Sequence, residues 1–276
     1  MNGECILKHR VDVHLKEYLN ECDADVFKTA LELLYSELSL DCVNFDPYVK
    51  NSDQIPQKES NKRRELAELV VLQVRYFGSD TGAYAIRNIF KDEPGVTYLE
   101  VVRDVADDLN RHLKKERTIP RLATMDDLEM LIVQQILDVS FQGKSQEQVI
   151  EMLESAGLDK DAARITAKEI AAVGAGGTIL LALVNLLGKN TVKAVIQNAM
   201  VWMLAKRMGK EAAIKFAGKA LGEVAAKRIA GFLSGVGWAL LAFDAYNFVG
   251  GPAKRITIPF VSFIATSRVV DRALSS

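Results

Sequence analysis

The sequence predicts an all-α protein, a multi-helix bundle with an N-terminal helical subdomain and a Gly/Ala-rich hydrophobic C-terminal helical region. Three observations lead to this fold class. Apolar residues recur at three- and four-residue steps in most segments before residue 171, which is the period of an amphipathic helix. The 276 residues include only six prolines, which interrupt helices. No convincing alternation of apolar and polar residues appears before residue 255, so no strand is expected there.

The N-terminal part is expected to hold three helices and a linker. Residues 1–40 show helical spacing with one break, where Asp23 is expected to cap a second helix. The polar residues 46–60 include two prolines among charged residues and are expected to form a linker. Residues 61–78 show a strong amphipathic pattern, and Gly78 is the expected C-cap of this helix.

Further helical segments are expected along the rest of the chain. Thr97 and Thr124 are expected N-caps, because a threonine hydroxyl accepts hydrogen bonds from the first helical turn. Gly157 is expected to join two short helices. Near the C-terminus, "ITIPFVSFIA" (256–265) is expected to be a short strand-like or broken helical segment around Pro259. The other expected helical segments are residues 79–90, 97–113, 125–139 and the two halves of 145–172.

Charge is distributed unevenly along the chain, although the net charge is only −1. From Ala171 onward there are thirteen lysines and arginines and four acidic residues, whereas residues 1–170 hold twenty-two basic and thirty-two acidic residues. The basic half is therefore expected to bind either the acidic half or an anionic membrane lipid. Nucleic acid is not expected, because no aromatic ladder for stacking bases accompanies the basic residues. The expected regions are an N-terminal helical subdomain (1–45), a linker (46–60), an acidic helical domain (61–170) and a basic, glycine-rich region (171–276).

Two apolar segments in the last region leave two alternatives open. Residues 170–188 carry no charge, and residues 229–253 contain a long apolar run with Asp244 inside it. Their lengths are close to the roughly 20 residues that span a bilayer. Four glycines lower the helix propensity of the first segment. The charge of Asp244 disfavours insertion of the second segment into a bilayer. The segments are either buried helices of a compact bundle or helices that meet a membrane.

Between these segments, small residues recur at four-residue steps, a pattern that allows close helix packing. A basic side next to such a stripe is typical of proteins that bind membrane surfaces, but it also suits a solvated helix. The helix-packing candidates are Gly218, Gly222, Gly231 and Gly235. The membrane-contact candidates are Lys206, Arg207, Lys210, Lys215, Lys219, Lys227, Arg228, Trp238 and Phe243.

Catalytic chemistry is not expected. His9, His14 and His112 are not at metal-ligand spacing, and the three cysteines form no C-x-x-C pair. The chain lacks the phosphate-binding, nucleophile-elbow and zinc-protease motifs. We therefore expect no enzyme, no cofactor and no metal. The N-terminus has no long apolar stretch of a secretory signal, which favours a cytoplasmic protein that can associate with the inner membrane.

Three stretches resemble a known family. "NKRRELAELVVLQVRYFGSDTGAYAIR" (61–87) is followed by "YLEVVRDVADDLN" (98–110), and "GGPAKRITIPFVSFIATSR" (250–268) lies near the end. Together they resemble the YaaW family of uncharacterised bacterial proteins, sometimes described as similar to ubiquinol–cytochrome c chaperones. The resemblance implies a helical fold, supplies no catalytic residues, and through the chaperone description implies a module that holds a hydrophobic client. The residues that match the motifs are Phe77, Gly78, Asp80, Arg87, Arg255, Thr257, Ile258 and Pro259.

Two functions are therefore expected as alternatives. The first is a non-enzymatic helical protein that associates with membranes, and can insert into them, through its C-terminal hydrophobic region; it is a candidate membrane-perturbing effector. The second is a soluble adaptor or assembly chaperone that binds a protein client. In either case Asp244 must be paired, protonated or exposed to water, because a carboxylate is costly in an apolar environment.

Overall fold

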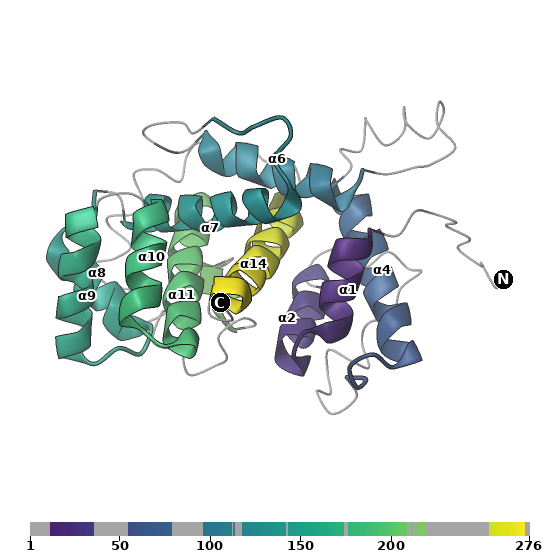
Figure 1. Ribbon diagram of the computed structural model, residues 1–276, viewed down its shortest axis with the longest axis horizontal. Helices are drawn as coiled ribbons and strands as arrows, with labels where there is room; N and C mark the ends of the chain where they lie inside the picture. Colours follow the sequence, from purple (N-terminus) through teal and green to yellow (C-terminus); the bar gives the residue numbers. More distant parts are fainter. Residues whose placement is uncertain are drawn as a thin grey trace. The chain divides into compact units, whose positions relative to one another are not determined.

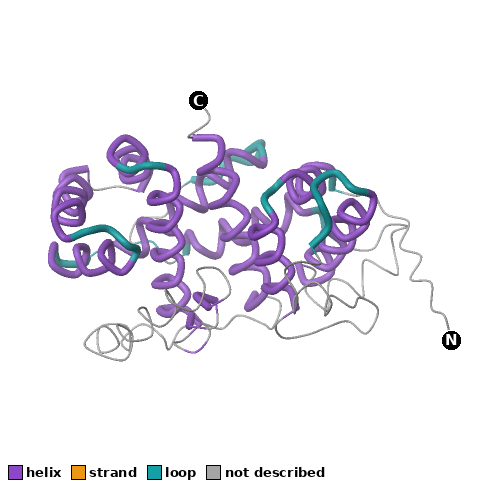
Figure 2. The backbone as a smooth tube through the Cα atoms, turned by 90° about the horizontal axis from the view of Figure 1, so that it is seen from below, coloured by secondary structure: helices purple, strands orange, loops and turns teal. Residues whose placement is uncertain are grey.

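The structure is a computed structural model, and every regular element that it describes is a helix (Figure 2). The all-α class is thus confirmed. The described residues are 12–35, 55–78, 96–111, 113, 118–141, 143–173, 176–208, 211, 213–214, 216–218 and 254–273.

The helices follow one another along the chain as the apolar spacing predicts (Figure 1). Their bounds are α1 (Val13–Glu21), α2 (Ala24–Tyr35), α4 (Asn61–Gly78), α6 (Tyr98–Asn110), α7 (Met125–Phe141), α8 (Gln146–Ser155), α9 (Lys160–Val173), α10 (Gly176–Leu186), α11 (Lys189–Met208) and α14 (Lys254–Ala273).

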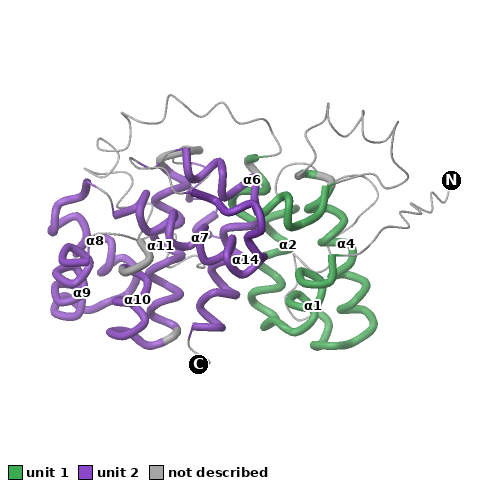
Figure 3. The backbone as a smooth tube through the Cα atoms, turned by 45° about the horizontal axis from the view of Figure 1, so that its top comes forward, with its two compact units in different colours: residues 1–102, 250–260 green, residues 103–249, 261–276 purple. Residues whose placement is uncertain are grey.

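The chain divides into two compact units (Figure 3). The first contains residues 1–102 and 250–260, and the second contains residues 103–249 and 261–276. This division differs from the four regions expected from composition. The structure groups α1 and α2 with α4 because these helices share one core, and it groups α9 with α10 across the change in composition near residue 171.

The core of the first unit forms where α1 and α2 pack against α4. Leu15 and Leu19 of α1, Phe27 and Leu31 of α2, and Val70 of α4 are completely buried. Leu15 and Leu19 lie four residues apart, as do Phe27 and Leu31, so α1 and α2 each present one apolar stripe to α4. Burial of these stripes explains why α1, which has only nine residues, is stable as a helix.

The second unit is built around α7. In Figure 1, α7 runs across α10 and α11, and it packs against both. The helix α8 packs against α9 and α11, and α9 packs against α10. Ser140 on α7 donates a hydrogen bond of 2.6 Å to the backbone oxygen of Ala199, and Asn198 donates one of 2.8 Å to the backbone oxygen of Met152. These bonds connect α11 to α7 and α8 inside the core.

Several helix ends agree with the sequence. The Thr97 hydroxyl accepts a hydrogen bond of 3.2 Å from the backbone N–H of Glu100, and the Thr124 hydroxyl accepts one of the same length from Asp127. The Glu100 and Asp127 carboxylates accept hydrogen bonds from the two threonine backbone N–H groups, which completes both capping boxes. Gly157, between α8 and α9, has a φ of +101°, a conformation that glycine adopts without strain.

The C-terminal segment corrects one expectation. Residues 256–265 are neither a strand nor a broken helix, because α14 continues through Pro259 to Ala273. Proline removes one N–H from the helical ladder and disfavours such a position by about 3 kcal/mol. Here burial outweighs that loss, since every residue from Ile256 to Ser267 is buried.

The uncharged residues 170–188 do not form one helix: α9 ends at Val173 and α10 begins at Gly176. With eleven residues, α10 is about 16 Å long, roughly half the thickness of a bilayer core. Within the described parts of the chain, no helix combines the length and the apolar character needed to cross a membrane.

Candidate functional site

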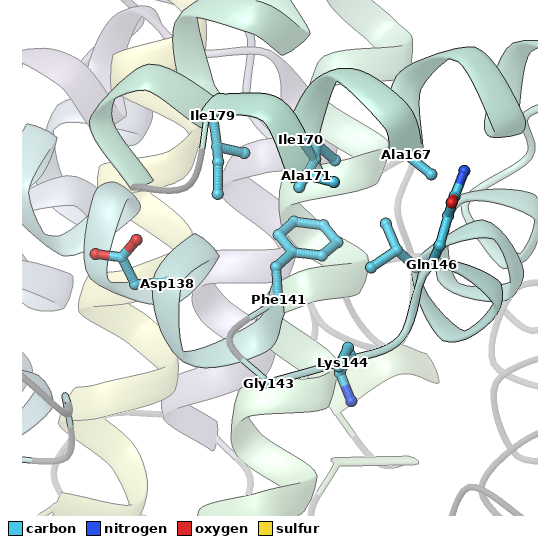
Figure 4. Close-up of a pocket in the computed structure, with 10 residues that line it drawn as sticks. Asp138, Phe141, Gly143, Lys144, Gln146, Ala167, Ile170, Ala171 and Ile179 are labelled. Carbon is cyan, nitrogen blue, oxygen red and sulfur yellow. The ribbon is translucent and has the colours of Figure 1, made fainter.

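A cleft of about 240 Å³ opens in the second unit where α7, α8, α9 and α10 meet. Its floor is apolar, and Phe141, Val149, Ile170 and Ile179 are each no more than 7% exposed. Figure 4 shows the Phe141 ring facing Ile170 and Ala171 of α9. The lining residues are Asp138, Phe141, Gly143, Lys144, Gln146, Val149, Ala167, Ile170, Ala171 and Ile179.

The cleft has the chemistry of a site for an apolar group. Its volume is below the roughly 300–1,000 Å³ of most cofactor and ligand pockets, so it fits one large side chain better than a whole cofactor. The head groups of Asp138 and Lys144 point away from the Phe141 ring (Figure 4). The Lys144 ammonium lies 4.6 Å from the centre of the Trp202 ring, a cation–π contact that holds the lysine at the rim.

An exposed apolar surface lies on α10. Leu181 is 62% exposed and Leu186 is 44% exposed, whereas Ile179, Leu180 and Leu183 of the same helix are buried. No residue of α10 is charged. The helix therefore buries one apolar side against α7 and α9 and presents further leucines to its surroundings. We call Leu181 and Leu186 the α10 leucines.

A buried charge cluster connects α7 and α14. Glu129 is completely buried, and its two carboxylate oxygens lie 3.1 Å from Arg268 Nη1 and 3.3 Å from Arg272 Nη2. Both arginines also contact Asp126, one turn earlier on α7 and 61% exposed. Breaking a buried ion pair is strongly destabilising because it leaves one charge unpaired. The cluster therefore holds the C-terminal helix to α7.

Glu129 gives folding stability a defined pH dependence. Burial raises its pKa from 4.5 to about 7, against the opposing effect of Arg268 and Arg272. The folded protein then holds the proton more tightly than the unfolded chain. This contribution to stability is fully present below pH 4.5 and is lost as the pH rises through 7.

We therefore expect the free energy of unfolding of the wild-type protein to fall between pH 5 and 8, with a contribution from Glu129 on the order of 3 kcal/mol. Urea unfolding at several pH values measures it, with Glu129→Gln as the comparison because glutamine does not titrate. The free energy of unfolding should therefore fall more steeply with pH in the wild type than in Glu129→Gln. Parallel curves would show that Glu129 is not the titrating group.

A second buried charge, Arg63, lies in the first unit and has a structural role. Its Nε donates a hydrogen bond of 2.8 Å to the backbone oxygen of Leu19, and its Nη2 donates one of 2.9 Å to that of Cys22. The guanidinium lies 3.6 Å from the centre of the Phe27 ring. Arg63 thus satisfies carbonyl groups at the end of α1. Burial raises the pKa of the neighbouring Cys22 thiol to about 11, so this thiol stays protonated at neutral pH and is a poor nucleophile.

The structure describes few of the residues that the sequence singled out. Phe77 is buried in α4, Gly78 ends that helix, and Pro259 lies within α14. A Cβ placed on Gly218 meets no heavy atom within 4 Å. Lys206 and Arg207 belong to α11, and Arg255 belongs to α14, but the structure does not describe their side chains. The candidates outside the described residues are Asp80, Arg87, Lys210, Lys215, Lys219, Gly222, Lys227, Arg228, Gly231, Gly235, Trp238, Phe243 and Asp244.

Sequence reasoning missed Glu129, Arg268, Arg63 and the cleft. Glu129 lies between the buried Leu128 and Ile132, and Arg63 lies three residues before the buried Leu66. A charge at a core position of an amphipathic helix was the available signal, since such a residue must find a buried partner. Within the described ranges, no three histidine, cysteine or acidic side chains gather as metal ligands do.

Comparison with known proteins shows a similarity to a bacterial protein. No family model matches the chain, and no solved structure matches it. The chain is 26% identical over 206 residues to a UPF0174 protein of Helicobacter pylori (strain J99), a match that covers 74% of this chain and 71% of the relative. The chain thus resembles a bacterial protein of an uncharacterised family, and the resemblance extends over most of both sequences.

Proposed function

We propose that this chain is a non-enzymatic helical protein of the cytoplasm that associates with anionic membrane surfaces through its C-terminal region. The observation that carries the proposal is the exposure of the α10 leucines on a helix without any charge. Insertion of the region into the bilayer, which would make the protein a membrane-perturbing effector, is a further step of the same proposal. We also propose membership of the YaaW family, on the motifs at residues 61–87, 98–110 and 250–268.

Apolar and electrostatic contributions both favour this association. Moving a leucine side chain out of water contributes up to about 1.5–3 kcal/mol, and the α10 leucines are partly exposed to water. The region from residue 171 onward holds thirteen lysines and arginines and four acidic residues, which attracts it to anionic lipid. A short apolar helix within a basic stretch of the sequence suits association with the interface without a spanning helix.

The double variant Leu181→Glu/Leu186→Glu tests the proposal. We expect the fraction bound to phosphatidylglycerol-containing vesicles to fall at least tenfold, because two apolar contacts are replaced by charges that the lipid repels. Vesicle flotation measures the bound fraction. Val13→Glu is the matched control, because Val13 is 56% exposed on α1 in the acidic part of the chain.

Three results would contradict the proposal. They are a wild-type protein that does not float with vesicles, a double variant that floats as well as the wild type, and an equal loss in Val13→Glu. The basic contribution has its own signature: binding by the wild type should weaken as salt rises, because exposed charges are screened over about 10 Å at 0.1 M salt.

A second candidate function is a soluble adaptor or assembly chaperone, and the cleft favours it. An apolar floor of this volume accepts one large side chain, the usual anchor of a protein partner. The cleft lies between four helices that pack together, so it is largely formed before a client arrives.

Filling the cleft tests this second function. Ala171 and Ala172 are both exposed on α9, but only Ala171 lines the cleft. We expect Ala171→Phe to abolish retention of any client that the immobilised wild-type protein captures from a bacterial lysate, and Ala172→Phe to keep it. Mass spectrometry of the retained proteins measures the difference. Identical retention by both variants would contradict a client site in the cleft.

A further inference from the structure

A tight turn between α6 and α7 presents the most exposed apolar side chain among the described residues. Leu122 is 95% exposed, more than any other large hydrophobic residue described. The backbone N–H of Ala123 donates a hydrogen bond of 3.2 Å to the oxygen of Pro120, which closes a β-turn with Arg121 and Leu122 at its centre. We call residues 120–123 the Leu122 turn.

The Leu122 turn is held rigidly on both sides. Arg103 of α6 donates two hydrogen bonds of 3.0 Å, one to the backbone oxygen of Pro120 and one to that of Arg121. On the other side, Ala123 is buried, and Thr124 forms the capping box that starts α7. A loop fixed in this way loses little conformational entropy when it docks, because it is already ordered.

The charges of the residues next to Leu122 in the sequence indicate which kind of surface the turn contacts. Arg121, its neighbour at the centre of the turn, is exposed. In the sequence, residues 111–121 hold five lysines and arginines and one glutamate, although residues 1–170 as a whole are acidic; residues 112 and 114–117 lie outside the described residues. Of the two acidic residues that follow, Asp126 contacts Arg268 and Arg272, and Asp127 is engaged in the capping box.

From this combination we propose that the Leu122 turn is a second membrane contact, in which Leu122 enters the interface of an anionic bilayer and Arg121 lies against lipid phosphate. This inference rests on the proposed membrane function and extends it beyond the region from residue 171 onward. An apolar tip with a positive charge beside it combines the two attractions that hold a protein at a membrane surface. An isolated exposed leucine is common on protein surfaces. Leu122 differs because the two hydrogen bonds from Arg103 hold its turn in place and because the exposed Arg121 is its neighbour in the turn.

Vesicle flotation of the full chain tests the inference with Leu122→Glu. We expect the bound fraction on phosphatidylcholine vesicles that contain phosphatidylglycerol to fall about tenfold, with Val13→Glu as the control that keeps binding. Thermal unfolding should be unchanged in both variants, since neither side chain is buried. Arg121→Gln should reduce binding to anionic vesicles more than binding to pure phosphatidylcholine vesicles.

A spectroscopic readout reports insertion directly. Leu122→Trp is expected to show a blue-shifted emission and quenching by brominated acyl chains when anionic vesicles are added, compared with the same measurements on the wild type and on Val13→Trp. A blue shift and quenching of Leu122→Trp no larger than those of Val13→Trp would overturn the inference.

The outcomes separate the two proposals. If Leu122→Glu binds vesicles like the wild type while the α10 double variant does not, the Leu122 turn is no membrane contact and the proposed function stands. If the wild type does not bind vesicles, both proposals are overturned. If only the Leu122 variants lose binding, the membrane function is supported through the turn and the role of α10 is overturned.

Discussion

Replacement of Arg268 by methionine is expected to lower the free energy of unfolding by about 1.4 kcal/mol at pH 8, because one of the two arginines that favour the charged form of Glu129 is lost and this carboxyl, with its pKa of about 7, takes up a proton instead. The Arg268 side chain is only 13% exposed and lies 3.1 Å from a Glu129 oxygen, so solvent does not replace the lost partner. Urea unfolding followed by circular dichroism measures the change.

The cost of Arg268→Met should shrink as the pH falls, because a protonated Glu129 needs no cationic partner. The matched control is Arg164→Met, since the Arg164 side chain is 57% exposed and lies 3.9 Å from Asp161. This exposed pair is expected to contribute no more than about 1 kcal/mol. Equal effects of the two substitutions would show that the buried cluster does not hold α14 in place.

Replacement of Arg63 by methionine is expected to destabilise the first unit by about 3 kcal/mol. The substitution removes two hydrogen bonds of a charged donor to carbonyl oxygens at the end of α1, and each such bond contributes about 1.5–3 kcal/mol. Part of this loss is offset, because methionine is easier to bury than a guanidinium, whose pKa is lowered by its burial.

Arg64→Met is the control for Arg63→Met, since Arg64 is the next residue of α4 and is exposed. It changes the same charge on the same helix and is expected to alter stability by less than about 0.5 kcal/mol. Differential scanning calorimetry of both variants gives the comparison. A Tm of Arg63→Met equal to that of Arg64→Met would show that the hydrogen bonds from Arg63 to the end of α1 do not contribute to stability.

The helices were predictable because their signals are local. Thr97 and Thr124 cap helices as expected, and Gly157 separates α8 from α9, because hydroxyl caps and positive φ angles act within a few residues. The error at Pro259 shows the limit of this reasoning. Local propensity disfavours proline inside a helix, but burial of α14 along most of its length decides the outcome.

The candidate site was harder to predict than the fold, since it depends on contacts between distant segments. The cleft needs residues of four helices between Asp138 and Ile179, and only packing shows which of their faces meet. Glu129 and its arginine partners are about 140 positions apart in the chain. The exposure of Leu181 on α10 could not be read from a segment without charge, because every side of such a helix looks apolar.

The helix α14 has a consequence for the order in which the protein matures on the ribosome. Its first residues, up to Phe260, belong to the unit that also contains residues 1–102, and its remaining residues belong to the other unit. Domains usually fold one after another as the chain emerges from the ribosome. The second unit cannot be complete until the end of synthesis, because Arg268 and Arg272, the partners of the buried Glu129, lie among the last nine residues of the chain.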